Sequence, residues 1–79
     1  MKMEEIIRMM QSDDYIERFK SEYELLKLRM ERLERTIHIY DYLFMSHKPP
    51  KELLLIQLQS LQTYMMLLEY RAKVENIIL

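Results

Sequence analysis

The chain of 79 residues contains no cysteine and no glycine. Without cysteine it forms neither a disulfide nor a thiolate metal site. Without glycine, phosphate-cradling loops, tight hairpin turns and dinucleotide-binding fingerprints are excluded, because their backbone conformations cost other residues free energy. The two histidines, His38 and His47, are nine residues apart, and His47 falls in a predicted loop. We interpret them as unrelated surface residues and expect neither a metal nor a cofactor.

The sequence also lacks an excess of charge of either sign and any long apolar run. A formal net charge of -1 gives no electrostatic attraction to nucleic acid or to an acidic membrane surface. No apolar run reaches the roughly 18 residues of a membrane-spanning helix, and the start lacks the basic-then-apolar order of a signal peptide. We therefore expect a cytoplasmic protein that binds no DNA, no RNA and no membrane.

What the sequence does contain is a long amphipathic stretch at residues 15–44. Its inward positions are spaced alternately three and four apart, and all are apolar or aromatic. They are Ile16, Phe19, Tyr23, Leu26, Met30, Leu33, Ile37, Tyr40 and Phe44. An unbroken seam predicts a helix packed along its whole length at a shallow crossing angle. The aromatic residues are too bulky for a two-stranded zipper, so the seam favours a bundle of three or more helices.

Local signals set the boundaries of the predicted elements. Ser12, Asp13 and Asp14 offer N-cap oxygens before the long helix, whereas Pro49 and Pro50 break any helix that reaches them. We predict one all-α domain with four segments. The first is a short N-terminal helix or arm at 1–11, and the second, 12–45, contains a long helix at about 13–45. A proline-containing turn follows at 46–50. The last segment, 51–77, contains the second helix, which is expected to span about 50–77. Because the turn is short, the two long helices are expected to form an antiparallel hairpin.

The first segment has two open interpretations. Residues 1–11 combine apolar Ile6, Ile7, Met9 and Met10 with charged neighbours, which is typical of a short amphipathic helix. It is either a mobile lid or swapped arm that seals a subunit contact, or a frayed terminus, since short helices are marginal alone.

The second helix carries two apolar stripes. One stripe is expected to face the long helix and consists of Leu54, Leu58, Leu61, Met65, Leu68 and Ala72. The other consists of Leu53, Ile56, Leu67, Tyr70, Val74 and Ile77. Burial of the second stripe is worth on the order of 10 kcal/mol, and a hairpin alone would leave it in water. The pattern predicts an obligate homo-oligomer, with two hairpins in an antiparallel four-helix bundle as the minimum.

Two sets of polar residues are candidates for ligand or partner binding. Arg29, Arg32 and Arg35 recur on the long helix, and guanidinium groups suit phosphate or carboxylate. The alternative is a solvated face that interleaved glutamates neutralise. Gln57, Tyr64 and Arg71 are spaced seven apart on the second helix. They either line a polar groove for a ligand or form the wet edge of an interface.

The order of these features resembles a known group of proteins. The features are Arg32 and Leu33 in a long charged helix, the leucine-rich run 53–64 with its Gln-Leu pair and Tyr64, and the closing run 68–72. They are similar to those of small helical-hairpin proteins of tailed bacteriophages and prophages. The likeness covers about residues 20–75. Most such proteins have no assigned activity. Some phage helical oligomers of similar scale counter bacterial defence by sequestering signalling nucleotides between subunits or by binding a defence protein.

The resemblance implies a non-enzymatic oligomeric binding protein of phage or prophage origin. It would counter host defence by sequestering a small anionic, nucleotide-like ligand or by binding a host protein. The alternative is a purely structural or adaptor bundle that acts only through protein–protein contacts. We do not expect an enzyme, because the sequence offers no Ser/His/Asp set, no cysteine nucleophile and no metal-ligand spacing.

Overall fold

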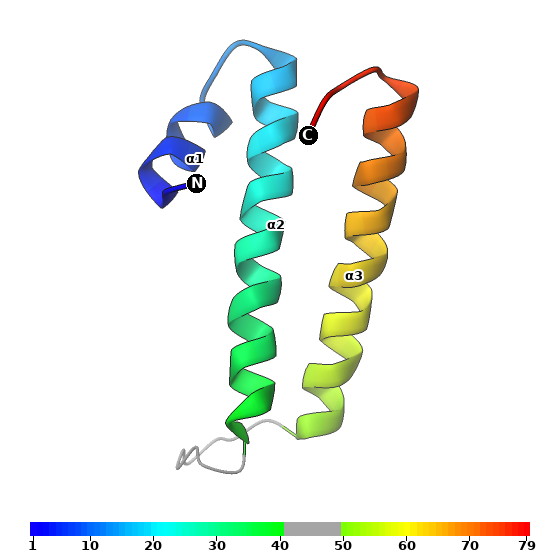
Figure 1. The fold of residues 1–79 in the computed structure, drawn as a ribbon. Coiled ribbons are helices and arrows are strands. Elements are labelled where there is room, and N and C mark those ends of the chain that lie inside the picture. Colours follow the sequence, from blue (N-terminus) through cyan, green and yellow to red (C-terminus); the bar gives the residue numbers. More distant parts are fainter. Residues whose placement is uncertain (41–49) are drawn as a thin grey trace.

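The computed structural model describes residues 1–40 and 50–79, and within them the regular secondary structure is all helix (Figure 1). Helix α1 spans Met3–Met10, α2 spans Tyr15–His38 and α3 spans Lys51–Val74. Helices α2 and α3 lie side by side with opposite directions, which confirms the predicted antiparallel hairpin. Helix α1 folds back along α2 on the side away from α3.

Helix α2 begins where the sequence predicts and ends earlier. The Asp14 side chain is the N-cap, and its Oδ1 accepts a hydrogen bond of 3.0 Å from the backbone N–H of Ile16. The helix ends at His38, with Ile39 as its C-cap, rather than near residue 45. The β-branched and aromatic residues of the run 36–40 have low helix propensity, which explains the early end. The rest of the predicted extension and most of the predicted turn lie outside the described residues.

The N-terminal segment forms a helix packed on its own chain. Ile6 of α1 is fully buried, as is Ser21 on α2, the helix against which α1 lies. The Ser21 hydroxyl donates a hydrogen bond of 2.6 Å to the backbone carbonyl of Arg18, so its burial leaves no polar group unsatisfied. The α1 face that carries Ile6 is therefore covered by α2 within one chain.

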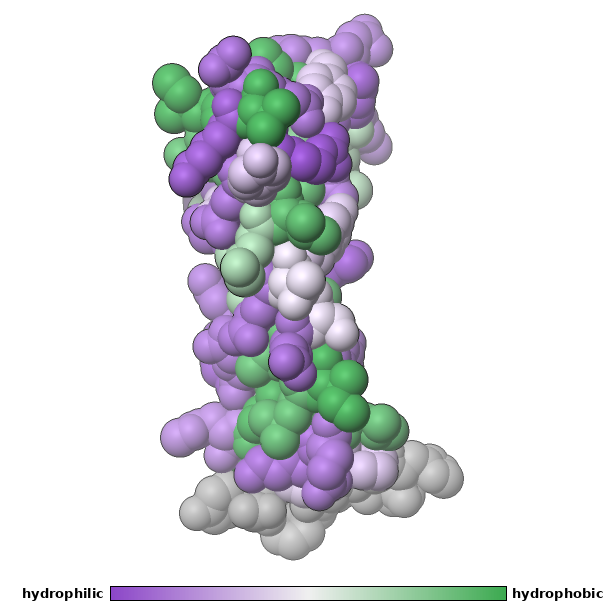
Figure 2. Space-filling model, turned by 90° about the vertical axis from the view of Figure 1, so that its right-hand side faces the viewer, coloured by the Kyte–Doolittle hydropathy of each residue, from purple (hydrophilic) through white to green (hydrophobic). Residues whose placement is uncertain are grey.

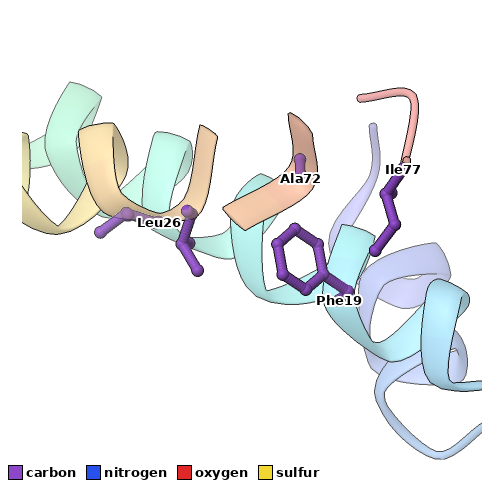
Figure 3. Packing of buried hydrophobic residues seen from close by; sticks show 5 residues of the cluster. Phe19, Leu26, Ala72 and Ile77 are labelled. Carbon is purple, nitrogen blue, oxygen red and sulfur yellow. The ribbon is translucent and has the colours of Figure 1, made fainter. Parts of the chain in front are cut away.

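The main core lies between α2 and α3 (Figure 3), in the half of the hairpin where Figure 1 marks both termini. It joins Phe19 and Leu26 of α2 to Leu68 and Ala72 of α3, and Ile77 closes it. The other members of the predicted inner stripe, Leu54, Leu58, Leu61 and Met65, are half-buried in the same seam. The inner stripe of α3 was thus predicted correctly, because its three-and-four spacing matches the contact line of two nearly parallel helix axes.

The prediction for Ile77 was wrong. We expected Ile77 in the outer stripe of a helix that runs to residue 77, but α3 ends at Val74 and Ile77 is only 8% exposed. Asn76 adopts a left-handed conformation with φ 58°, and the N–H of Ile77 bonds to the carbonyl of Ala72 at 2.8 Å. This Schellman-type end turns the chain back over the hairpin. Ile77 therefore contributes to the core of a single chain.

The remaining residues of the outer stripe are exposed. Leu53, Ile56 and Leu67 expose 57%, 58% and 57% of their surface, and Tyr70 and Val74 expose 67% and 66%. Figure 2 shows the side of the molecule that carries α3, where apolar surface gathers toward both ends with more polar surface between. Exposed apolar area of this extent on a short chain is typical of an interaction surface.

Candidate functional site

An open groove lies between α2 and α3 on the half of the hairpin away from the core. It has a volume of about 370 Å³. Its lining residues are Arg29, Arg32, Leu33 and Thr36 from α2 and Gln57 and Leu61 from α3. The structure thus brings together three of the predicted ligand-binding residues, Arg29, Arg32 and Gln57. A volume of this size suits a small organic ligand.

The groove is cationic because neither of its two arginines has a carboxylate partner among the residues that the structure describes. Within residues 1–40 and 50–79, the ion pairs are Lys27 with Glu24 at 3.6 Å and Arg71 with Glu75 at 3.3 Å. Arg29 and Arg32 are exposed and take part in neither pair. Their guanidinium groups are therefore available to an anion, and a planar fork of N–H donors fits the oxygens of phosphate or carboxylate.

The other lining residues give the groove an apolar floor and further polar groups. Leu33 and Leu61 are half-buried and lie on the contact line of the two helices. The Thr36 hydroxyl donates to the backbone carbonyl of Arg32 at 3.0 Å, which leaves its oxygen as an acceptor. The Gln57 amide offers both donors and an acceptor. The groove combines cationic, amide and apolar contacts, the usual composition of a pocket for a small polar ligand.

Sequence reasoning did not single out Leu33, Thr36 or Leu61 as site residues. A signal for Thr36 was present, because Arg29, Arg32 and Thr36 are spaced three and four apart and so share one face of the helix. The contribution of Leu61 depends on how α3 lies against α2, which no pattern within one helix reveals.

Arg35 lies outside this groove. It lines a second, shallower surface depression on α2 with Glu31, Glu34 and His38. Because two carboxylates outnumber the single guanidinium, this depression does not attract an anion. The three predicted arginines therefore differ. The charges of Arg29 and Arg32 are an uncompensated pair among the described residues, whereas the charge of Arg35 is compensated by Glu31 and Glu34.

Arg71 also lies away from the groove, at the opposite end of the hairpin. Its Nη2 donates to the Tyr15 hydroxyl oxygen at 3.0 Å, its Nε donates to Glu75 Oε2 at 3.3 Å, and the Tyr15 hydroxyl donates to Glu75 Oε1 at 2.6 Å. The Arg71 guanidinium carbon is 5.0 Å from the centroid of the Phe19 ring. This closed triangle joins the first residue of α2 to the end of α3. Tyr64 lies between the two ends of α3 and is 38% exposed.

The triangle shifts the titration of its members. The hydrogen bond from the Tyr15 hydroxyl lowers the pKa of the Glu75 carboxyl. Burial opposes this shift in pKa, and Arg71 adds to it. The same hydrogen bond, together with burial, raises the pKa of the Tyr15 hydroxyl. Because the folded-state pKa of Glu75 is depressed, its contribution to stability is complete above the unfolded-state pKa and is lost as pH falls through the folded-state pKa.

We expect the chain to lose thermal stability in acid partly through Glu75. The melting temperature of the Glu75→Gln variant should fall less than that of the parent chain between about pH 7 and about pH 3, since the variant has no carboxylate to protonate. Circular dichroism melts at several pH values measure this. The matched control is Glu5→Gln, which changes an exposed carboxylate of α1. A Glu75→Gln profile identical to that of the control would contradict the assignment.

Within residues 1–40 and 50–79, no three histidine, aspartate or glutamate side chains gather in a way that could hold a metal ion. Among the described helices none is both long and apolar enough to cross a membrane.

The architecture and the groove define a small helical-hairpin protein with a cationic pocket between its two long helices. A family model named Sequestin matches residues 13–74, which include all of α2 and α3. The chain therefore belongs to the Sequestin family. Neither the curated proteins nor the solved structures include a significant match to this chain.

Proposed function

We propose that this protein is a non-enzymatic binding protein that sequesters a small anionic, nucleotide-like ligand in the groove between α2 and α3. The observation that carries the proposal is the uncompensated pair Arg29 and Arg32 facing the Gln57 amide across an apolar floor. Membership of a family named Sequestin is compatible with sequestration as the activity.

The composition of the groove favours this ligand class. A guanidinium pair without nearby carboxylates attracts phosphate oxygens, and the half-buried leucines favour contact with a planar, less polar part of the same molecule. Among the described lining residues the one hydroxyl is that of Thr36, which donates to the backbone carbonyl of Arg32, and no imidazole or carboxylate stands beside it to act as a base. The ligand would accordingly be held and released unchanged, so the protein would act by stoichiometric capture rather than by turnover.

The proposed setting is the cytoplasm of a bacterial host during phage infection. The similarity to hairpin proteins of tailed phages and prophages suggests that the chain is encoded by such an element. Capture of a nucleotide signal would then counter a host defence that depends on that signal. Homo-oligomerisation belongs to the same proposal, because the exposed outer stripe of α3 needs a partner.

One observation favours a second candidate function. The exposed apolar stripe of α3 is itself a surface for protein–protein contact, so a chain without a ligand could act as an adaptor or bind a host protein. The two candidates make different demands on the groove. Sequestration requires Arg29 and Arg32, whereas an adaptor that uses only the outer stripe does not.

The test compares two arginines of one helix. Arg32→Ala should weaken binding of a phosphorylated probe at least about tenfold, because it removes a charge-assisted contact worth roughly 1.5–3 kcal/mol. Arg35→Ala is the matched control, since Arg35 lies outside the groove beside two glutamates. Isothermal titration with AMP, ADP and cyclic AMP, and mass spectrometry of small molecules released from protein purified from infected cells, supply the two readouts.

Equal effects of the two substitutions would mean that the arginines act only through general charge, which contradicts a site in the groove. Absence of binding to the panel together with absence of any released molecule would leave the adaptor function as the better account. Both variants should keep the melting temperature of the parent chain, because both side chains are exposed.

A further inference from the structure

One face of α3 carries a complete three-and-four repeat that the single chain leaves uncovered. Its members are Leu53, Ile56, Ser60, Thr63, Leu67, Tyr70 and Val74, and every one of them is exposed. We call this set the outer face of α3. A repeat of this period is what a helix needs to pack lengthwise on another helix. The inner stripe of α3 already packs on α2 in this way, so the outer face is a second surface suited to packing on a helix.

The outer face lacks charge along most of its length. Charged residues make up 32% of the chain, yet none occurs between Leu53 and Leu68. Depletion of charge is the compositional mark of the core of an interface. Charges return only at the ends of α3, with Glu52 at its start and Lys73 near its last turn. The position of these charges restricts the partner.

We propose that the outer face pairs with the outer face of a second copy of this chain, antiparallel and in one register. About a two-fold axis between residues 61 and 62, Leu53 faces Tyr70 of the second copy, and Ile56 faces Leu67. Ser60 faces Thr63 at the centre. Large apolar residues thus meet each other at both ends, and the hydroxyl residues meet in the middle. A face that matches itself under a two-fold rotation is what an isologous dimer requires.

Charge complementarity selects this register and direction. In an antiparallel helix pair, the residues that flank the contact line on one side lie next to the residues at the equivalent positions of the second helix. In the proposed register, Glu52 of one copy therefore lies next to Lys73 of the second copy, and the two are opposite in charge. A parallel pairing instead places Glu52 near the uncharged Gln57 and offers Lys73 no acid.

The pairing also completes the groove, and this step rests on the proposed function. At about 100° per residue, Gln57 and Tyr64 project between the inner stripe and the outer face. In the proposed register, Tyr64 of the second copy lies beside Gln57, which lines the groove. The second copy thereby supplies an aromatic wall to a groove that is open in the single chain. Each site then takes its arginines from one copy and Tyr64 from the other.

Cysteine cross-linking tests the register without any ligand. The chain has no native cysteine, so Ile56→Cys and Leu67→Cys each give a single thiol on the exposed outer face. We expect an oxidised mixture of the two variants to yield a disulfide-linked heterodimer. Either variant alone should stay unlinked, because its own thiols would be about 16 Å apart along the axis, beyond disulfide reach.

Efficient linking of either variant by itself would show a parallel arrangement, and no linking in any sample would show that a second copy does not cover this face. Either result overturns the proposal. A circular dichroism melt of each variant verifies that the hairpin has folded, which is expected for substitutions at exposed positions.

A second pair tests the shared groove. A short bis-maleimide should join Gln57→Cys in one chain to Tyr64→Cys in a tagged second chain, and Gln57→Cys alone should remain unlinked. A disulfide between positions 56 and 67 without this second link would overturn the contribution of Tyr64. If both links form and no ligand is ever found, the dimer stands and only the sequestering function fails.

Discussion

Replacing Leu68 with alanine is expected to lower the free energy of unfolding by about 2–5 kcal/mol, the cost of a cavity where a leucine is fully buried. Leu68 has 0% exposure and lies in the cluster that joins α2 to α3. A hairpin this small has little stability to lose, so much of the population of the variant should be unfolded at room temperature. Urea denaturation followed by circular dichroism measures the effect.

The adjacent residue provides the control. Leu67 is 57% exposed on the outer face of α3, so Leu67→Ala should change the stability of the isolated chain by less than about 0.5 kcal/mol. Destabilisation by Leu67→Ala should appear only at protein concentrations where chains associate. Equal losses for Leu67→Ala and Leu68→Ala at low concentration would contradict the division of α3 into an inner stripe and an outer face.

The second large effect is expected from Leu67→Glu. A carboxylate at the centre of an apolar contact must be desolvated without a partner, so association through the outer face of α3 should be lost. Helix content should be kept, since Leu67 is exposed in the single chain. Sedimentation velocity reports the mass of the assembly, and circular dichroism reports the fold.

Gln62→Glu is the charge-matched control, because Gln62 is exposed on α3 but is not part of the outer face. It should leave the mass of the assembly unchanged. A Leu67→Glu protein that keeps the full oligomeric mass would show that subunits associate through another surface.

The helical hairpin could be predicted because its signals are local or periodic. The N-cap at Asp14 follows from a local residue type. The seam of α2 from Phe19 to Leu26 and the inner stripe of α3 follow from spacing within one helix. The family match over residues 13–74 agrees with a small protein made of these two helices. Its phage origin and its assembly state stay predictions.

The features that sequence reasoning missed depend on backbone geometry or on contacts between helices. The turn at Asn76 needs a left-handed residue, a role in which glycine is the usual signal and asparagine the weaker one. Asn76 was therefore included in a continuous helix, and Ile77 was placed on the wrong face. The groove likewise depends on α3 placing Gln57 opposite Arg29 and Arg32, while Arg35 lies next to two acids.

The central claim is that the groove holds a small anionic molecule, and native mass spectrometry of freshly purified protein tests it most directly. We expect an oligomer that carries an extra mass of a few hundred daltons per site, released on denaturation. The double variant Arg29→Ala/Arg32→Ala should form the same oligomer without that mass. An oligomer of bare mass from cells that contain the signal, or an adduct that persists in the double variant, would contradict the claim.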